Sequence, residues 1–356
     1  MSKSSPPHSI IDIPKNGLFL YIADRIPTPL SLRPLDAAWD PSLATEDGDE
    51  SCWTPLQLAA RSGDADKVAQ ILTSSPSAVN DPPCGYYGQT ALQAACLQGH
   101  EDVVKLLLST SADIHFAGGN NFQRNALQIA CDQGNQTIVE MLLEAGAKIN
   151  TPLSDNSPAP HRSPPKLAKT TTVVTRYNGR TALQAAIERG HLQIATRLLD
   201  LGAEVNAPPS PTGGCTALQA AAHGGFTAMM QLLLHHGALV NQPAARYKGF
   251  TALQGACLTG NLEAVDILIK AGANIYAFGG LYGEGTALHA AAENGHGEII
   301  KKLVEAGADI NSYHIRRWQT PIQGAAAGGH TDVVQLLRSM GAAGKTGGGG
   351  FLFPRI

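Results

Sequence analysis

Eight near-copies of one six-residue motif, separated by almost constant intervals, constrain the fold of this chain more than any other feature. The motif reads TALQAA in three copies, and five variants keep most of it. The copies begin at Thr54, Thr90, Asn125, Thr181, Thr216, Thr251, Thr286 and Thr320. Successive starts are 36, 35, 56, 35, 35, 35 and 34 residues apart. A fixed period of roughly 20 to 50 residues is the signature of stacked repeats, so the chain is predicted to be an array.

Glycine marks the predicted end of a helix in every copy. Nine residues after the eight starts stand Gly63, Gly99, Gly134, Gly190, Gly225, Gly260, Gly295 and Gly329. Such regularity predicts a left-handed residue that closes a first helix. A second amphipathic segment with paired aliphatic residues follows, and a second glycine ends it in six copies. Ser75 and Ser111 replace that glycine in the first two copies, so we expect those two ends to be less well capped.

The full pattern resembles the ankyrin repeat family. In the second copy the matching residues are Thr90, Leu92, Ala95, Gly99, His100, Val103, Leu107, Leu108, Ala112 and Asp113. The resemblance covers about residues 51–343. It implies an all-α ankyrin-repeat solenoid of about eight helix-turn-helix units with finger loops. The ALQAA form of the motif is similar to ankyrin arrays of filamentous fungi.

One position departs from the family pattern throughout. The usual motif reads T-P-L-H, but only His289 keeps the histidine. Glutamine takes its place at Gln57, Gln93, Gln128, Gln184, Gln219, Gln254 and Gln323. Because a buried amide needs hydrogen-bonding partners, we expect these side chains to link neighbouring units. A ladder that reads a ligand is the alternative.

The register of the motif sets the predicted domain boundaries. We place the units near residues 51–80, 87–115, 122–150, 178–206, 213–241, 248–276, 283–311 and 317–343. Residues 1–50 are expected to form an N-terminal extension that is partly disordered and partly a cap over the first unit. The long interval contains a proline-rich, locally basic insertion at 151–175, and a glycine-rich tail follows at 344–356.

Small residues recur on the first helix of each unit, where they let neighbouring helices approach closely. The family resemblance implies a curved solenoid whose first helices and fingers form a concave surface. The small residues expected to line it are Ala94, Ala185, Ala220, Gly255 and Gly324. We therefore predict a shallow, weakly charged groove with aromatic finger tips along one rim.

Composition excludes several classes of partner and compartment. The formal net charge is −3, so no strong field favours nucleic acid. No apolar run approaches the roughly 18 residues of a membrane span, and the first ten residues lack the apolar region of a secretory signal. Six cysteines without a CxxC pair indicate reduced thiols. We expect a monomeric intracellular protein, cytoplasmic or nuclear, that binds neither nucleic acid nor membrane.

Candidate chemical groups are few. The histidines that follow the first glycine lie one or more repeats apart and cannot share a metal. Cys96, Cys131 and Cys257 occupy a position that elsewhere holds Ala or Ile, which predicts buried packing groups. Cys84 and Cys215 fall in predicted fingers, and we expect them to be exposed. No nucleophile or acid–base pair stands out, so we predict no catalytic residue, no cofactor, no metal and no enzyme activity.

The predicted fingers contain much of the chain's small aromatic content. One type of finger is proline-rich, as in NDPPCGYYGQT, and the other contains Gly-Gly, as in YAFGGLYGEGT. Exposed Tyr, Trp and Arg are favoured interface anchors. The candidate partner-binding residues are Tyr86, Tyr87, Tyr177, Tyr247, Tyr282, Tyr313, Arg316, Arg317 and Trp318. The alternative is that each tyrosine packs on the neighbouring finger and aligns the row.

Three functions compete at this point. The preferred one is a non-enzymatic scaffold that binds protein partners through the concave finger and inner-helix surface. The second is an accessory component of a fungal metabolic, possibly secondary-metabolite, pathway that recruits an enzyme or holds a small molecule. The third is a regulatory module that acts through the basic insertion at 151–175, where Ser157 and Ser163 each precede a proline.

Overall fold

The chain folds into pairs of short α-helices. The computed structural model describes residues 53–83, 88–116, 124–150, 180–209, 214–245, 249–280, 285–313 and 319–343. Within these ranges there are sixteen α-helices and no β-strand. The predicted N-terminal extension, the insertion at 151–175 and the tail lie outside the described residues. All described residues belong to one compact part of the chain, Thr45–Ile356.

Each repeat contributes one pair of helices, numbered here as units 1 to 8. The first helices are α2 (Pro55–Ser62), α4 (Ala91–Gln98), α6 (Ala126–Gln133), α8 (Ala182–Glu188), α10 (Ala217–Gly224), α12 (Ala252–Thr259), α14 (Ala287–Glu293) and α16 (Pro321–Ala327). The second helices are α3 (Ala65–Ser74), α5 (Glu101–Ser109), α7 (Gln136–Glu144), α9 (Leu192–Asp200), α11 (Thr227–His235), α13 (Leu262–Lys270), α15 (Gly297–Glu305) and α17 (Thr331–Ser339). A 3₁₀ turn, Pro76–Asn80, follows α3.

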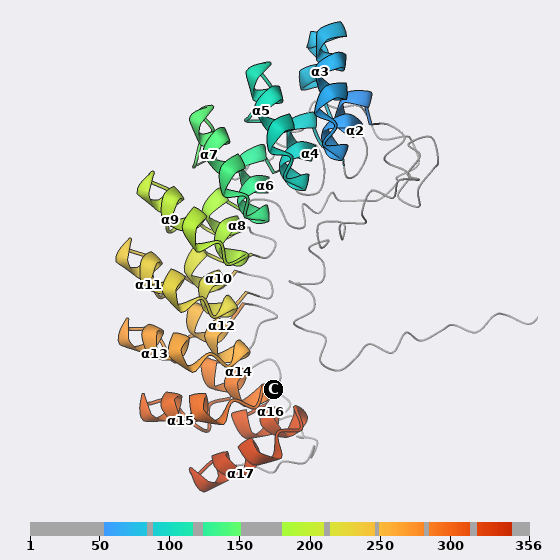
Figure 1. Cartoon of the computed structure of the whole chain (residues 1–356). Helices are drawn as coiled ribbons and strands as arrows, with labels where there is room; N and C mark the ends of the chain where they lie inside the picture. Colours follow the sequence, from blue (N-terminus) through green and yellow to red (C-terminus); the bar gives the residue numbers. More distant parts are fainter. Residues whose placement is uncertain are drawn as a thin grey trace, which may run out of the picture. The chain divides into compact units, whose positions relative to one another are not determined.

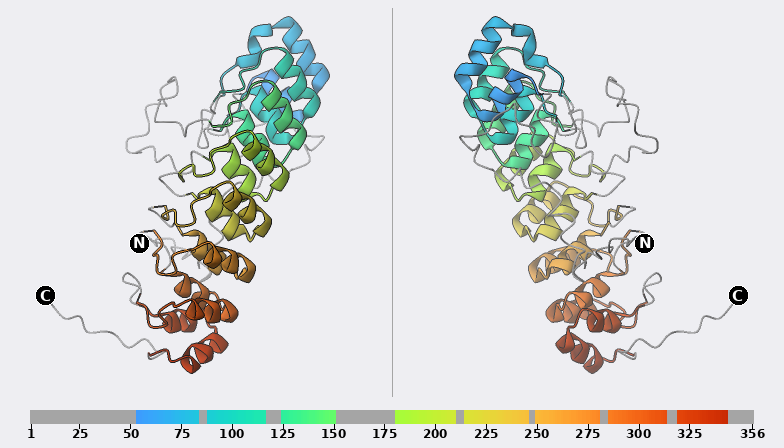
Figure 2. Two further views of the ribbon diagram at one scale, coloured as in Figure 1. Left: turned by 90° about the vertical axis from the view of Figure 1, so that its left-hand side faces the viewer. Right: turned by 90° about the vertical axis from the view of Figure 1, so that its right-hand side faces the viewer.

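The pairs stack in sequence order. Figure 1 shows the even-numbered helices in one row, on the side of the finger loops, and the odd-numbered helices in a second row on the opposite, left-hand side. Figure 2 shows the same order from both sides. Each helix packs on the equivalent helix of the next unit and on its own partner. We call the even-numbered helices inner and the odd-numbered helices outer. The predicted all-α repeat solenoid is confirmed.

A reciprocal capping box begins the inner helices. In unit 1 the Thr54 hydroxyl accepts the N–H of Gln57, and Gln57 Oε1 accepts the N–H of Thr54 at 2.9 Å. The same exchange occurs in units 2 to 6, with Asn125 as the cap in unit 3. It satisfies backbone donors that would otherwise lack a partner at the helix start. The repeated Thr-x-x-Gln spacing is thus a helix-start signal.

The repeated glycines adopt the predicted conformation. All eight glycines that follow an inner helix have φ between 69° and 81°. In several units the next unit's histidine covers this glycine closely. A Cβ at Gly134 would lie 2.2 Å from the His191 ring, and one at Gly260 would lie 2.5 Å from the His296 ring. Both the backbone and the neighbouring unit therefore require glycine at these positions.

The two units that lack the second glycine end differently. Ser111 adopts the left-handed conformation with φ 64°, and Ala112 N–H then bonds to Leu107 O as in the other units. Ser75 has φ −143° and leads into the 3₁₀ turn instead. The residue equivalent to Ala112 in unit 1 is Pro76, which has no N–H to donate. Proline thus removes the bond that closes the other outer helices.

The core is continuous from one unit to the next. Leu92, Leu127 and Leu183 from inner helices and Leu107 and Leu142 from outer helices are almost completely buried. Cys96, Cys131 and Cys257 are also buried, as the exchange with alanine predicted. Burial raises the pKa of these thiols, since a thiolate would lose its hydration there. They are packing groups.

Candidate functional site

The nine predicted anchors fall mostly outside the described residues. Tyr86, Tyr87, Tyr177, Tyr247, Tyr282, Arg316, Arg317 and Trp318 lie there, as does Cys84. Tyr313 is described, and its side chain is exposed. The described site must therefore be built from the bases of the fingers and from the inner helices on which they stand.

The repeated glutamines hold the fingers in place. In the proline-rich fingers, the amide donates to two successive carbonyls of one arm. Gln57 Nε2 reaches Asp81 O and Pro82 O at 3.3 and 3.2 Å, and units 4 and 5 repeat this pattern. In the Gly-Gly finger of unit 2, Gln93 Nε2 instead joins both arms, at Phe116 O and Arg124 O.

The second Gly-Gly finger is held in the same way as the first. Gln254 Nε2 joins Ala277 O and Gly285 O on its two arms. His289 of unit 7 uses its Nε2 for the carbonyl of Gln319, 3.2 Å away. Six of the seven glutamines are buried, and the amide nitrogens of these six donate to carbonyls of the fingers that lead to the next unit, so the predicted link between neighbouring units is confirmed for them. The two finger types recognised in the sequence have two distinct clamps.

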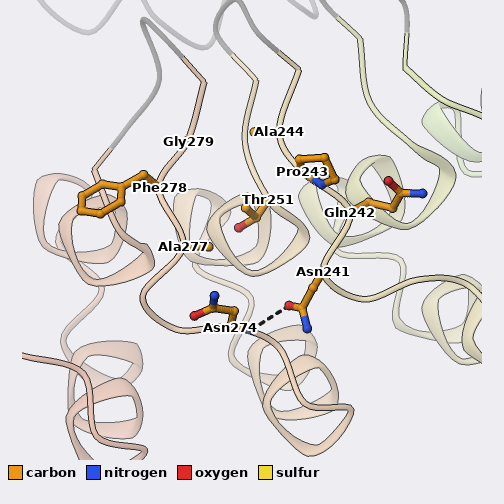
Figure 3. Close-up of a pocket in the computed structure, with 9 residues that line it drawn as sticks. All are labelled: Asn241, Gln242, Pro243, Ala244, Thr251, Asn274, Ala277, Phe278 and Gly279. Atoms are coloured by element: carbon orange, nitrogen blue, oxygen red, sulfur yellow. Dashed lines mark hydrogen bonds between the residues drawn. The ribbon is translucent and has the colours of Figure 1, made fainter.

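A second ladder runs along the starts of the fingers. Asn241 Oδ1 accepts the N–H of Asn274 at 2.7 Å, and its amide donates to Gly272 O at 2.9 Å (Figure 3). Asn80 and Asn206 bind the following unit in the same manner. Asn150 does so across the long interval, through Gly202 O and Glu204 N–H. The register of the array therefore continues across the position of the insertion.

Two of the described finger aromatics contact neighbouring parts of the array, and a third is exposed. Tyr276 takes the place of the ladder asparagine, and its hydroxyl donates to Gly307 O of the next unit at 3.0 Å. Phe250 is buried and packs on the ring of His223, with centroids 5.0 Å apart. These two align the row. Phe278 is 53% exposed.

A hollow of about 330 Å³ lies between two neighbouring fingers. One wall comes from the finger before α12 and the other from the finger before α14 (Figure 3). Its lining residues are Asn241, Gln242, Pro243, Ala244, Thr251, Asn274, Ala277, Phe278 and Gly279. Behind it, Gly280 N–H donates to Gly249 O at 2.8 Å and ties the two fingers together. The hollow is small and has both polar and apolar lining residues.

Paired positions on the finger side of the inner helices vary from unit to unit. In units 1, 3 and 4 the residue just before the helix cap contacts the residue eight positions later, in the last turn of the same helix. In unit 1 this places the Arg61 guanidinium 5.1 Å from the centre of the Trp53 ring. In unit 3 it joins Arg124 to Asp132. We define the inner-face row by three positions in each of the eight units. They are the residue just before the cap, the residue eight positions later, and the residue directly after that one.

Units 3 and 4 place five charged groups together on the inner-face row. Arg124 Nη1 lies 3.2 Å from Asp132 Oδ2, and Arg189 Nε lies 3.3 Å from Asp132 Oδ1. Arg180 pairs with Glu188. Three guanidinium groups thus face two carboxylates. The prediction of a weakly charged surface is wrong here, because residues spaced eight apart and in different units meet only after folding.

Burial alters the titration of this ionic cluster. The pKa of Glu188 is raised because its carboxylate loses hydration, although Arg180 and Arg124 oppose the shift. The pKa of Arg124 is lowered for the same reason, against the attraction of Asp132. Cys215 lies beside the cluster. It is half-buried, whereas the sequence predicted that it would be exposed. Burial, with a smaller contribution from Glu188, raises its thiol pKa to about 12, so a reactive thiolate is disfavoured.

The inner-face row is neutral in units 5 and 6. Its pairs are Cys215 with His223 and Phe250 with Leu258. Burial lowers the pKa of His223, opposed by a bond with the backbone of Gly255, so the imidazole is neutral near pH 7. The following residue in unit 5 is the exposed Gly224. The charged and neutral stretches are direct neighbours.

The small residues of the inner helices do not line the surface, contrary to expectation. Ala94 and Ala185 are fully buried, and Ala220 is nearly so. A Cβ at Gly255 would lie 3.0 Å from the Phe250 ring, and one at Gly324 would lie 2.8 Å from Glu293 Cγ. At Gly255 and Gly324 a member of the inner-face row covers the small residue. The row itself is partly buried, and in units 4 to 6 its accessible members include Arg189, Gly224 and Thr259.

Metal and histidine chemistry find no support in the described part of the chain. No group of three or more His, Cys, Asp or Glu side chains there could hold a metal ion. His100 Nε2 lies 3.0 Å from Arg61 O, and His191 and His296 make the equivalent contact with the preceding unit. These histidines join units.

Comparison with known families matches this architecture. The family described as "Ankyrin repeats (3 copies)" matches residues 40–117, 56–152, 208–279 and 279–346, and "Ankyrin repeat" matches residues 178–208. The chain belongs to the ankyrin repeat family. Ankyrin repeats are generally protein–protein interaction modules, and members of the family are typically non-enzymatic. The matched segments include all eight units.

A solved structure with the same fold is the human ASB11 ankyrin repeat domain. The two chains share 22% identity with a TM-score of 0.55, over 72% of this chain and 100% of that one. This likeness shows the fold alone. No curated protein matches the sequence. Among the described residues, no helix combines the length and apolar character that crossing a membrane requires.

Sequence reasoning missed the inner-face row. Its signal was present as the eight-residue spacing between Arg124 and Asp132 and between Arg180 and Glu188. Opposite charges at that spacing, one just before a helix cap and one in the last turn, are not neighbours on an ideal helix. They meet because the first residue of each pair belongs to the finger.

Proposed function

We propose that this ankyrin array is a non-enzymatic scaffold that binds a protein partner through its fingers and inner-face row. The observation that carries the proposal is the contrast between a constant frame and a variable surface. Caps, clamps and ladders repeat from unit to unit, whereas the inner-face row changes from an ionic cluster to a neutral stretch. A surface that varies on a fixed frame can distinguish partners.

Further support comes from the fingers. Phe278 presents an aromatic ring beside a preformed hollow, and the hollow is too small for more than part of a partner. Aromatic anchors that enter pockets supply much of the affinity in protein interfaces. Three of the four described thiols are buried, and the carboxylates of the ionic cluster are paired with arginines, which suits contact better than catalysis.

A steric block on the inner-face row tests the proposal. Thr259 is exposed at the end of α12, next to the neutral stretch, so Thr259→Arg adds bulk and charge at that surface. The control is Gln231→Arg, at an exposed position of outer helix α11. A partner captured with the full chain and identified by mass spectrometry should bind Thr259→Arg at least tenfold more weakly than wild type, as an interface clash implies. Unchanged binding by Thr259→Arg would rule out this surface.

The sequence-predicted anchors are tested separately. We propose that Tyr87, Tyr247 and Trp318 contribute to the same interface from their finger tips. A triple alanine variant should lose about 2 kcal/mol or more of binding free energy for each true anchor. Equal affinity of the variant and the wild-type chain for the captured partner, measured by titration calorimetry, would show that these residues are not anchors.

A further inference from the structure

The most accessible group of the ionic cluster is an arginine with spare donors. The Arg189 side chain is 29% exposed, whereas Asp132 beneath it is 4% exposed. Arg189 uses its Nε for Asp132, at 3.3 Å. Within the described residues, neither of its two terminal amino groups has a hydrogen-bonding partner. The guanidinium is thus held at one edge and free at the other.

This arrangement suits a carboxylate. An arginine presents a planar fork of donors that matches two carboxylate oxygens, and an arginine already fixed in place loses less side-chain entropy on binding. The five charged groups of the cluster sum to +1, since three arginines face two acids. An incoming anion would therefore balance the excess positive charge of these five described groups.

The surface beside Arg189 has a different character. Gly224 occupies the equivalent position in unit 5, where it is exposed and adds no side chain beside the neutral stretch around His223 and Phe250. A Cβ at Gly224 would lie 2.3 Å from the Phe226 ring, so that ring would have to shift to admit a larger residue. The inner-face row is thus open and uncharged immediately after the arginine.

We propose that this stretch recognises an extended protein segment in which an aspartate or glutamate binds Arg189 and an apolar residue faces units 5 and 6. Packed helices are spaced by about 10 Å, and an extended chain advances about 3.3 Å per residue. The acidic and apolar residues are therefore separated by about three positions, in either chain direction. The inference rests on the proposed function, because it names the chemistry of the partner at that surface.

Selection from a random library tests the motif. The probe is a phage-displayed library of random 12-residue peptides, selected on the immobilised full chain. Enriched sequences should carry Asp or Glu with a Leu, Ile, Phe or Trp about three positions away. Enrichment of basic or uncharged sequences would overturn the proposal, as would failure to enrich any sequence.

Affinity measurements then assign the contact. A synthetic peptide of the enriched consensus should bind Arg189→Gln about tenfold to a hundredfold more weakly than wild type, as for a lost charged hydrogen bond. Arg189→Lys should give an intermediate loss, because it keeps the charge without the fork. The matched control is Arg197→Gln, on outer helix α9 of the same unit, which should leave the affinity unchanged. Equal affinity of wild type and Arg189→Gln would overturn the assignment.

Two further arms remove ambiguity. If Arg189→Gln does not fold, the same contact is tested on the wild-type chain with a peptide in which the acid is replaced by its amide, and a similar loss is expected. A phosphoserine peptide that binds more tightly than the acidic one would overturn the commitment to a carboxylate. If peptides without an acidic residue bind the wild-type chain but not Thr259→Arg, this inference is refuted and the proposed function still stands. Peptides that bind Thr259→Arg unchanged would refute the proposed surface itself.

Discussion

Units 3 and 4 and units 5 and 6 have the same frame but opposite surface chemistry. Both regions have capped inner helices, glutamine clamps and left-handed glycines. On the first, the inner-face row consists of arginines and acids in mutual contact. On the second, the same positions contain a thiol, a neutral imidazole, a phenylalanine and a leucine. The difference teaches that the repeat determines where side chains meet. The residue before each cap and the residue eight positions later determine the chemistry of the surface.

The largest effect is expected on the neutral side. Phe250→Ala removes a buried ring that covers Gly255 and contacts His223, and such truncations cost about 3–5 kcal/mol. Urea unfolding should show this loss in the free energy of unfolding. Phe278→Ala is the control, because its ring is largely exposed and should cost less than about 1 kcal/mol. Similar losses for both would mean that the neutral stretch is not a packed surface.

In the charged units 3 and 4, the loss in free energy of unfolding should be somewhat smaller. Asp132→Ala leaves Arg124 and Arg189 without their shared carboxylate, and breaking a buried ion pair costs about 3 kcal/mol or more. The matched change, Glu140→Ala, breaks an exposed pair with Arg197 on the outer helices and should cost about 0–1 kcal/mol. The comparison fails if the two variants unfold at the same urea concentration.

The shared frame should respond alike in both regions. Gly134→Ala in unit 3 and Gly260→Ala in unit 6 each force a left-handed residue with a Cβ against a histidine ring, so both should lose about 2 kcal/mol. Gly272→Ala has a similar backbone but open space around its Cβ, and about 1 kcal/mol is expected. A large difference between Gly134→Ala and Gly260→Ala would contradict a common frame.

The smallest effect concerns the neutral imidazole. Because burial lowers the pKa of folded His223, the unfolded chain takes up its proton first as the pH falls below about 6.5. This residue's contribution to stability is therefore complete above that pH and declines as the pH falls towards the lowered folded pKa. Wild type should lose more stability than His223→Gln between about pH 7.5 and about pH 5.5 in urea unfolding. Equal losses would show that His223 is not buried as a neutral group.

Much of the frame could be predicted from particular residues. The nine-residue interval from Thr90 to Gly99 contains a cap, one inner helix and its left-handed end, which are local properties of the backbone. The exchange of Cys96 with alanine elsewhere predicted its burial. The difference between Ser75 and Ser111 could not be read from the serines themselves, because it depends on the missing N–H of Pro76.

The candidate surface was less predictable for a physical reason. Ala185 and Gly255 are small and periodic, and from the sequence we predicted that they line a groove. Only the position of Phe250 and of the ionic pairs shows that they are covered. Cys215 likewise changes from an exposed loop thiol to a half-buried one once its neighbours are placed.

The amino-acid sequence by itself determined the repeat, the helices and their ends, because caps, turns and glycine conformations depend on residues a few positions apart. The tertiary structure decided which side chains share the surface. Asp132 meets Arg189 from a unit that begins 56 residues later, and Phe250 meets His223 across a unit boundary. Such contacts depend on how units stack, and stacking brings together groups whose separation in sequence carries no local signal.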